Sequence, residues 1–249
     1  MPRISAAVIA LNESRRIAAA VASVAPWVDE VFVLDGGSVD DTCARAREAG
    51  ARVEVCPFDG FVAQKQRATD RAAHDLIFSL DADERVDLEL GSALRVAAAE
   101  GKAGWTLNRR NYLDGAPMRA SGWYPDRRVR LFDRRRARWG GSDPHDRVLV
   151  DGPVGRLPGH LHHDPERTVE AYVRATQAHA ERRARSLVEE GARPGPATPW
   201  LHGGAHLLRK LTLGAAWLDG RRGLQVSWIG AQGVVTKYRR AAELLEERS

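Results

Sequence analysis

Residues 76–84 read Leu-Ile-Phe-Ser-Leu-Asp-Ala-Asp-Glu, an almost uninterrupted apolar run that ends in acidic side chains. Such a run is typical of a strand that is covered on both faces of a parallel sheet. Parallel strands must be joined by crossover connections, which are usually helices. In open sheets of this kind, ligands bind beyond the carboxyl ends of the strands. The stretch therefore predicts an α/β domain with acidic residues at its ligand-binding edge.

The residues before this strand predict its parallel neighbours. Short apolar runs alternate there with amphipathic helical stretches, which is the pattern of a doubly wound sheet. We expect strands at residues 4–10, 31–34 and 52–56, and helices that include residues 61–73 and 87–99. Asn12 or Ser14 is suited to cap the helix after the first strand, and Asp40 the helix after the second.

The second half of the chain shows weaker signals. Short strands are expected at residues 105–107, 129–132 and 148–150. Asp164 followed by Pro165 predicts the start of a long helix, because proline is favoured at the first helical position. Residues 200–245 also read as helical.

These signals divide the chain into two expected domains. Residues 1–163 form a Rossmann-like α/β domain with a mostly parallel sheet flanked by helices, in which residues 1–100 and 101–163 are the two halves. Residues 164–249 form a C-terminal helical extension. A chain of 249 residues is long enough for this arrangement without disulfide or metal staples.

Composition excludes several classes of protein. With 43% hydrophobic and 29% charged residues, the chain is neither disordered nor fibrous. Two cysteines are too few for a disulfide scaffold or a Cys-rich zinc module, and they fit a reducing cytosol. No stretch approaches 18 uncharged apolar residues and no signal peptide is evident, so we expect a cytoplasmic protein that does not span a membrane.

Positive charge is concentrated in the middle of the chain. The net charge is +5, and residues 109–138 carry ten basic and three acidic side chains. This block could face nucleic acid, anionic lipid or a phosphorylated substrate. The alternative is a solvated arginine-rich surface without a ligand.

Carboxylates follow three of the four expected parallel strands. Asp81 and Asp83 come directly after residues 76–80, Asp35 ends the second strand, and Glu13 follows the first. Two carboxylates in this spacing can aim oxygen atoms at one Mg²⁺ or Mn²⁺ ion that also binds substrate phosphates. The alternative is a solvated turn.

Three segments in this order resemble the family 2 glycosyltransferases. They are Val-Ile-Ala-Leu-Asn-Glu-Ser at residues 8–14, Val-Leu-Asp-Gly-Gly-Ser-Val-Asp-Asp-Thr at residues 33–42 and Phe-Ser-Leu-Asp-Ala-Asp-Glu at residues 78–84. Gly-Phe-Val-Ala-Gln-Lys-Gln-Arg-Ala at residues 60–68 is similar to the branch of lipopolysaccharide core β-1,4-glucosyltransferases. The resemblance implies the GT-A fold and a nucleotide-sugar site.

The resemblance also implies roles on the donor side of that site. Asp35 would hold the uracil, Asp81 would approach the ribose or the metal, and Asp83 would bind Mg²⁺ or Mn²⁺ directly. The full set of expected nucleotide-sugar contacts is Leu11, Glu13, Asp35, Lys65, Asp81, Ala82 and Asp83. Two alternatives stay open, since Asp35 could cap the following helix and Lys65 could be an exposed surface lysine.

On the acceptor side, Asp146 stands where the family has the glutamate that acts as general base. His163 matches a family histidine near the metal or the diphosphate. The residues expected near the diphosphate or the acceptor are Arg128, Arg130, Trp123 and His145. The alternatives are that Asp146 pairs with Arg147 and that His163 belongs to a surface cluster. Asp143 matches no catalytic position, so its replacement is expected to have a mild effect.

Together these features predict an inverting, metal-dependent transferase. The expected reaction moves a hexose from a UDP-sugar to a hydroxyl of a lipid-linked glycan such as lipopolysaccharide core, and glucose is the expected hexose. Nucleic acid is not an expected partner. Tryptophans and paired basic residues at 200–238 indicate peripheral contact with the cytoplasmic face of the inner membrane. The rival hypotheses are a basic binding module for nucleic acid or membrane and a nucleotidyltransferase.

Overall fold

The computed structural model describes residues 2–143, 145–164 and 167–247, apart from the side chain of His145. The chain divides into two compact units. The first unit consists of Met1–Arg110 and Asp126–Asp164, and the second consists of Asn111–Pro125 and Pro165–Ser249. The sequence places residues 111–125 in the α/β domain, whereas the structure groups them with the C-terminal helices.

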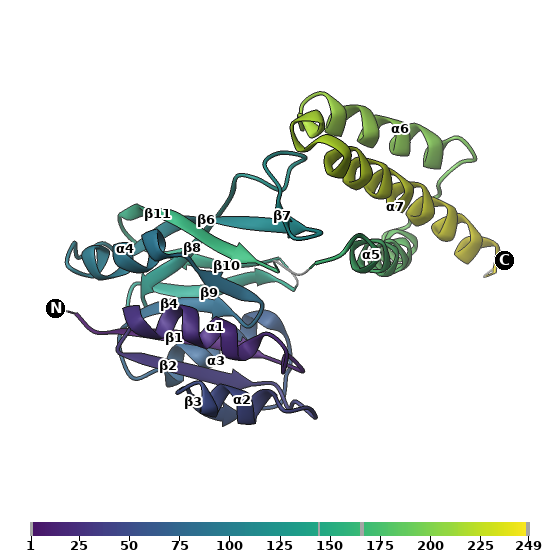
Figure 1. Ribbon diagram of the computed structural model, residues 1–249. Coiled ribbons are helices and arrows are strands. Elements are labelled where there is room, and N and C mark those ends of the chain that lie inside the picture. Colours follow the sequence, from purple (N-terminus) through teal and green to yellow (C-terminus); the bar gives the residue numbers. More distant parts are fainter. Residues whose placement is uncertain (1, 144, 165–166, 248–249) are drawn as a thin grey trace. The chain divides into compact units, whose positions relative to one another are not determined.

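Four parallel strands form one half of the sheet in the first unit (Figure 1), as the sequence predicts. Their order is β3-β2-β1-β4. The strands are β1 (Ile4–Ala10), β2 (Glu30–Asp35), β3 (Arg52–Val55) and β4 (Leu76–Asp81), and the helices between them are α1 (Ile17–Val24), α2 (Thr42–Glu48) and α3 (Phe61–Arg71), with a 3-10 turn η1 (Ala25–Trp27). The pairing sets Ala10 beside Asp35 and Ile9 beside Asp81, so the strand ends share one edge.

The other half of the sheet is antiparallel and was only partly predicted. Strand β8 pairs with β4, and the order continues through β6 and β11 to β5. These strands are β5 (Glu84–Val86), β6 (Gly104–Leu113), β8 (Asp126–Asp133) and β11 (Val154–His163); β7 (Ala116–Pro117) pairs with β6, and β9 (Ala137–Ser142) pairs with β10 (His145–Val150). Strand β5 has three residues, too few to show a period, and its partner lies far away in the sequence.

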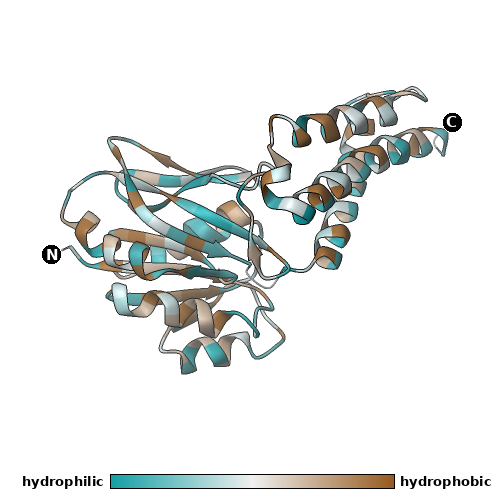
Figure 2. Ribbon diagram, turned by 45° about the horizontal axis from the view of Figure 1, so that its top comes forward, coloured by the Kyte–Doolittle hydropathy of each residue, from teal (hydrophilic) through white to brown (hydrophobic). Residues whose placement is uncertain are grey.

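Both faces of the parallel strands are buried, which explains their continuous apolar runs. Ile4, Ala6 and Val8 of β1 join the core under α1 and α4 (Leu88–Ala98). Ala7, which points to the opposite face, joins the core that includes α3. Helix α1 buries Ile17, Ala20, Val21 and Val24, the apolar stripe of a helix with 3.6 residues per turn. Figure 2 shows these apolar stretches in brown.

The predicted cap of α1 is wrong, because this helix follows Arg16 and has no side-chain cap. Helix α2 follows Asp41, whose side chain makes no cap, but Asp40 Oδ1 accepts from Thr42 N, the first residue of α2, at 3.0 Å, so Asp40 supports the start of this helix as predicted. Asn12 and Asp40 also link two loops. Asn12 Oδ1 accepts a hydrogen bond from Val39 N at 3.0 Å, and Asp40 Oδ2 accepts one from Ser14 N at 3.2 Å. The loops after β1 and β2 are therefore bonded to each other at the carboxyl edge of the sheet.

The second unit is helical. Its helices are α5 (Val169–Glu189), α6 (Thr198–Leu211) and α7 (Gly220–Glu246), with a 3-10 turn η2 (Ala216–Asp219). Helix α5 starts later than the sequence predicts, because Thr168 supplies the cap by accepting from Ala171 N at 3.2 Å; Pro165 lies outside the described residues. Asp219 accepts from the backbone of Arg119 and Ala120, which ties residues 111–125 to this unit. Across the described residues, no helix is long and apolar enough to cross a membrane.

Two helix glycines offer a test of this packing. An ideal Cβ on Gly91 of α4 would lie 2.3 Å from Trp27 Nε1, whereas one on Gly204 of α6 would meet no atom within 4 Å. Gly91→Ala should lower the free energy of unfolding by about 1–3 kcal/mol because of overpacking. Gly204→Ala should raise it by about 0.5–1 kcal/mol, the usual gain in helix propensity. Urea denaturation of both variants measures the two effects, and a gain at Gly91 would contradict the packing described.

Candidate active site

A cavity of about 440 Å³ lies at the carboxyl ends of β1 and β4 in the first unit. Residues from both halves of the sheet and from α3 line it. They are Ile9, Ala10, Leu11, Glu13, Phe58, Phe61, Gln64, Lys65, Asp81, Ala82, Asp83, Asp146 and His163. Eight of these residues are ones that the sequence analysis places on the donor side, at the base position or at the metal. The fold thus gathers residues that are up to 154 positions apart around one space.

Lys65 connects the two sides of this cavity. Only 5% of the residue is exposed, which excludes the surface-lysine alternative. Its Nζ lies 3.0 Å from Asp81 Oδ1 and 2.9 Å from Asp146 Oδ2, and 4.9 Å from the centre of the Trp139 ring. Because Asp146 pairs with Lys65, the alternative that Arg147 is the main partner of Asp146 is wrong. Lys65 therefore joins the end of β4 to strand β10.

Arg130 of β8 lies beneath Lys65 in the core. Its Nη2 is 2.8 Å from Asp81 Oδ2 and 2.7 Å from Glu84 Oε1. Glu84 is fully buried, and its second oxygen accepts from Asp81 N at 2.9 Å. The sequence analysis places Arg130 near a diphosphate, but the structure has this guanidinium bound to the buried Glu84 and the half-buried Asp81, and Arg130 is not among the residues that line the cavity.

The two carboxylates respond differently to burial. Burial opposes ionisation of Asp81, but the charges of Arg130 and Lys65 outweigh it and hold the pKa of Asp81 far below its usual range. Burial dominates at Glu84, where the pKa is raised in spite of Arg130. Arg130 and Lys65 therefore favour the charged form of Asp81.

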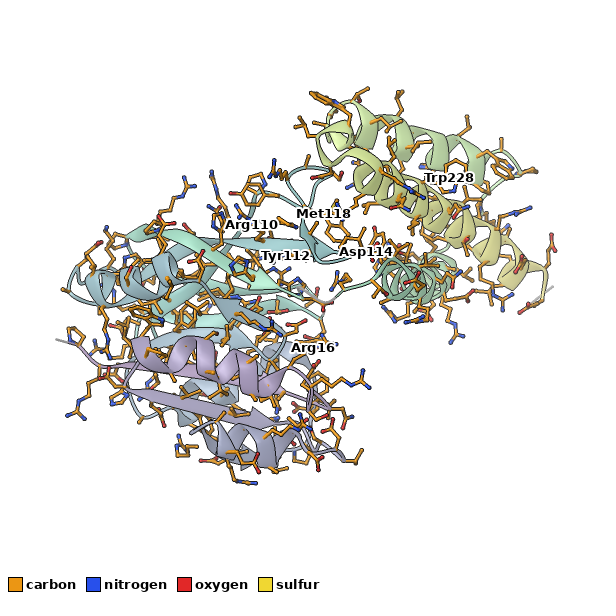
Figure 3. The ribbon with its side chains drawn as sticks, viewed as in Figure 1. Arg16, Arg110, Tyr112, Asp114, Met118 and Trp228 are labelled. Carbon is orange, nitrogen blue, oxygen red and sulfur yellow. The ribbon has the colours of Figure 1, made fainter. Side chains whose placement is uncertain are left out.

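Asp83 faces the cavity with a different partner. Strands β5 and β11 pair so that His163 lies opposite Glu84, which brings His163 Nε2 to 3.4 Å from Asp83 Oδ2. Arg16, labelled in Figure 3, has its Nη1 3.8 Å from the same oxygen. Burial raises the pKa of Asp83, but the hydrogen bond and charge of His163 outweigh it, and the net shift is downward.

Asp83 and His163 form a candidate cation site. Among the residues that the structure describes, no group of three or more His, Cys, Asp or Glu side chains could hold a metal by itself. Asp83 and His163 offer one carboxylate and one imidazole on the cavity wall. Mg²⁺ is commonly held by one or two carboxylates plus substrate phosphates, so the donor set fits a cation whose other ligands come from the substrate.

Glu13 and Leu11 lie on the loop after β1. Burial raises the pKa of Glu13, and Arg16 Nε lies 3.3 Å from its Oε2. Glu13 N donates to Thr42 Oγ1 at 2.8 Å, which fixes the loop against the start of α2. Leu11 presents an exposed apolar side chain to the cavity.

Asp35 is fully buried and does not line the cavity. Its Oδ1 accepts from Gly37 N at 2.9 Å and from Ser38 N at 2.7 Å, and Ser38 Oγ donates to Oδ2 at 2.6 Å. The helix-cap alternative is wrong, because α2 follows Asp41. The carboxylate instead shapes the turn that follows β2.

The β9–β10 hairpin holds Asp146 over the cavity. Asp143 accepts from Phe61 N and Val62 N, both at 3.1 Å, and so caps α3, because Gly60, the residue at the N-cap position, has no side chain to do this. Trp139 Nε1 donates to Thr69 Oγ1 at 3.1 Å. Asp143 therefore has a structural role at the start of α3, and the mild effect on transfer expected from its replacement stays a prediction. The His145 side chain lies outside the described residues.

Two other predicted residues lie elsewhere. Arg128 is on the surface of the first unit, where its Nε is 2.8 Å from Asp126 Oδ1. Trp123 belongs to the second unit, and its ring packs edge-to-face on Tyr172 with centroids 5.1 Å apart. His160 and His162 approach Asp87 rather than the cavity.

The sequence analysis missed five residues that line the cavity, Ile9, Ala10, Phe58, Phe61 and Gln64, and the buried Glu84 beside it. Phe58 and Phe61 line the cavity as an edge-to-face pair with ring centroids 5.1 Å apart. The signal for them was two phenylalanines on either side of an Asp-Gly turn at the start of a helix. Glu84 was also missed, since nothing local to it shows that Arg130 lies beside it.

The buried pairing of Arg130 predicts a large effect on stability. Arg130→Met should lower the free energy of unfolding by about 3–5 kcal/mol, because it leaves Asp81 and Glu84 buried without their shared cation. Arg128→Met, in the exposed pair with Asp126, is the matched control and should change it by less than about 1 kcal/mol. Chemical denaturation of both variants provides the comparison. Equal losses would show that Arg130 does not stabilise the core.

Comparison with known proteins agrees with this geometry. The family model described as glycosyl transferase family 2 matches residues 5–148. A glycosyltransferase of Rickettsia felis is 31% identical over 212 residues, which cover 77% of this chain and 72% of that protein. The lipopolysaccharide core biosynthesis glycosyltransferase LpsC of Rhizobium meliloti is 30% identical over 200 residues, which cover 77% of this chain and 74% of that protein.

Among solved structures, glucosyl-3-phosphoglycerate synthase from Mycobacterium tuberculosis in complex with Mg²⁺ and UDP aligns at 28% identity with a TM-score of 0.38. The alignment covers 46% of this chain and 44% of that one, so this chain spans less than half the length of that protein. The family assignment rests on the sequence matches. The parallel sheet with its flanking helices is the GT-A fold that the resemblance implies. The chain is a transferase that belongs to glycosyl transferase family 2.

Proposed function

We propose that the protein transfers a hexose, with glucose as the expected sugar, from a UDP-sugar to a hydroxyl group of a lipid-linked glycan of the lipopolysaccharide core type. The single observation that carries the proposal is the cavity in which Asp83 and His163 lie on one wall and Asp146 on another. The identity of 30% to LpsC supports the choice of acceptor.

The donor would occupy the part of the cavity formed by the loops after β1 and β4. Leu11, Phe58 and Phe61 offer apolar and aromatic surface to the nucleoside. Asp83 and His163 would hold Mg²⁺ or Mn²⁺, which, when bound, stabilises negative charge on the departing diphosphate. Asp81 would approach the ribose or the metal through Oδ1, since Arg130 and Lys65 both donate hydrogen bonds to its Oδ2 and Oδ1 accepts none.

Asp146 would act as the general base. In the proposed step the acceptor oxygen forms a bond to the anomeric carbon while the bond from that carbon to the diphosphate oxygen breaks. The proton of the acceptor hydroxyl passes to the Asp146 carboxylate. One displacement of this kind inverts the anomeric centre. Lys65, 2.9 Å away, holds the carboxylate in place.

The rival hypotheses receive less support. Much of the basic block at residues 109–138 is paired within the first unit. Its internal ion pairs include Arg109 with Asp126, Arg128 with Asp126, Arg130 with Asp81 and Glu84, Arg134 with Asp75 and Arg135 with Asp133. This pairing argues against a binding module for nucleic acid, and membership of a glycosyltransferase family argues against a nucleotidyltransferase.

A cytoplasmic location is part of the proposal. Both cysteines, Cys43 and Cys56, are free thiols, as expected in a reducing compartment. A lipid-linked acceptor would require contact with the cytoplasmic face of the inner membrane. That contact concerns the second unit and is considered below.

Replacing Asp83 tests the metal site. Asp83→Ala should abolish the extra thermal stabilisation that Mn²⁺ gives to the UDP complex, because the carboxylate that binds the cation is lost. In the parent protein, UDP at 100 times its dissociation constant should stabilise by about 2.7 kcal/mol. Asp151→Ala, an exposed carboxylate on the loop after β10, serves as the control. If the Asp83 variant keeps the Mn²⁺-dependent gain, the metal site lies elsewhere.

Replacing Asp146 tests the base. Asp146→Asn keeps the shape of the side chain but cannot take up the acceptor proton, so kcat should fall by about 10² or more. UDP-sugar affinity should change little. Asp151→Asn makes the same chemical change at an exposed position and should leave transfer intact. Single-turnover transfer from a labelled UDP-sugar to membrane extract is the measurement, and near-normal transfer by Asp146→Asn would refute the assignment.

A further inference from the structure

The three helices of the second unit line a groove of about 480 Å³ that the proposed function does not use. Apolar side chains from all three helices dominate its wall, and Arg239 is the charged residue among those that line it. The residues that line it include Val173 of α5, Trp200 and Leu207 of α6, and Trp228, Ile229, Val235 and Arg239 of α7. Figure 3 labels Trp228 on α7 beside α6.

Glycines explain why this groove is open. A Cβ on Gly203 would meet Val235 Cγ2 at 2.6 Å, so this glycine lets α6 approach α7 closely. A Cβ on the next residue, Gly204, would meet nothing within 4 Å although Gly204 lines the groove. Arg239 lies at the same site, with its guanidinium carbon 5.3 Å from the centre of the Trp200 ring. The groove is thus an unfilled, mostly apolar space next to the guanidinium of Arg239.

The two tryptophans of the groove are exposed, Trp200 by 61% and Trp228 by 56%. Further large apolar side chains are exposed nearby in the sequence, among them Leu208, Leu213 and Trp217. Tryptophan and leucine beside basic residues are typical of surfaces that enter the interface of a bilayer.

Charge in this segment is one-sided. Residues 200–242 carry seven basic side chains and one acidic side chain, Asp219, although one of the seven, Arg240, is paired with Glu181, Glu243 and Glu247. The Asp219 carboxylate is already used, since it accepts from the backbone of Arg119 and Ala120. A surface of this charge attracts anionic lipid headgroups. It repels a second copy of itself, which argues against self-association through the groove.

We propose that this groove binds an acyl chain of an anionic phospholipid, with the lipid phosphate at Arg239. Apolar walls match the chain, and the guanidinium matches the phosphate. Occupancy of the groove would attach the second unit to the membrane surface. The inference goes beyond the proposed function, because it concerns a lipid of the bilayer and not the sugar acceptor.

Co-sedimentation of the full-length protein with vesicles tests the proposal. We expect binding to phosphatidylcholine vesicles that contain phosphatidylglycerol and much weaker binding to pure phosphatidylcholine vesicles. Gly204→Leu, which fills the groove, should weaken binding by about tenfold or more. Ala205→Leu is the matched control, since it adds the same side chain at an exposed position of α6 outside the groove and should bind as the parent does.

A second pair of variants tests the headgroup. Arg239→Gln should reduce the preference for anionic vesicles more than Arg221→Gln, which removes an exposed charge that does not line the groove. Equal effects of this pair, or unimpaired binding by Gly204→Leu, would overturn the proposal. Binding of an acidic amphipathic peptide without binding of vesicles would also overturn it. Retained helical circular dichroism and UDP-dependent stabilisation in Gly204→Leu show that the variant is folded.

These outcomes are separate from those of the proposed function. Vesicle binding requires neither donor nor metal nor transfer, so it can fail while the Asp83 and Asp146 variants behave as expected. Conversely, loss of transfer in Asp146→Asn leaves vesicle binding unchanged. Quenching of tryptophan fluorescence by lipids with brominated acyl chains gives an independent readout, and Trp228→Phe should reduce that quenching.

Discussion

The guanidinium of Arg130, buried between Asp81 and Glu84, is the interaction on which the first unit depends. Arg130 comes from an antiparallel strand, and both carboxylates follow the last parallel strand. Burying charges is costly unless each one is paired, so the two halves of the sheet can meet here only with all three groups in place. The pairing therefore joins the half that would hold the donor to the half that carries the acceptor side.

As a result, the two carboxylates of Asp81-Ala82-Asp83 have different roles in the site. Asp81 forms ion pairs with Arg130 and Lys65, and the same Lys65 ammonium also pairs with Asp146. Asp83, two residues later, keeps only partly buried partners in His163 and Arg16 and faces the cavity. One carboxylate thus organises the site, and the other stays accessible to a ligand. Side chains held by several ion pairs suit a reaction that depends on the position of two substrates.

The second unit follows a different physical logic. Its core is small, its helices leave tryptophans and leucines in solvent, and its net charge is positive. If these helices only covered the sheet, their exposed apolar surface would add nothing to the stability of the protein. For a transferase that acts on a lipid-linked acceptor, a unit that prefers a bilayer surface would bring enzyme and acceptor to the same place.

The sequence by itself determined β1 to β4, the helices between them and the edge at which the acidic residues gather, because periodicity and strand length are local properties. The family motifs that mark Asp83 and Asp146 are local as well. Only the tertiary structure decided that Lys65 is buried between two carboxylates, that Asp143 caps α3 from 82 residues away and that β5 pairs with β11. These contacts depend on burial and on partners distant in the chain, and neither is encoded in the spacing of neighbouring residues.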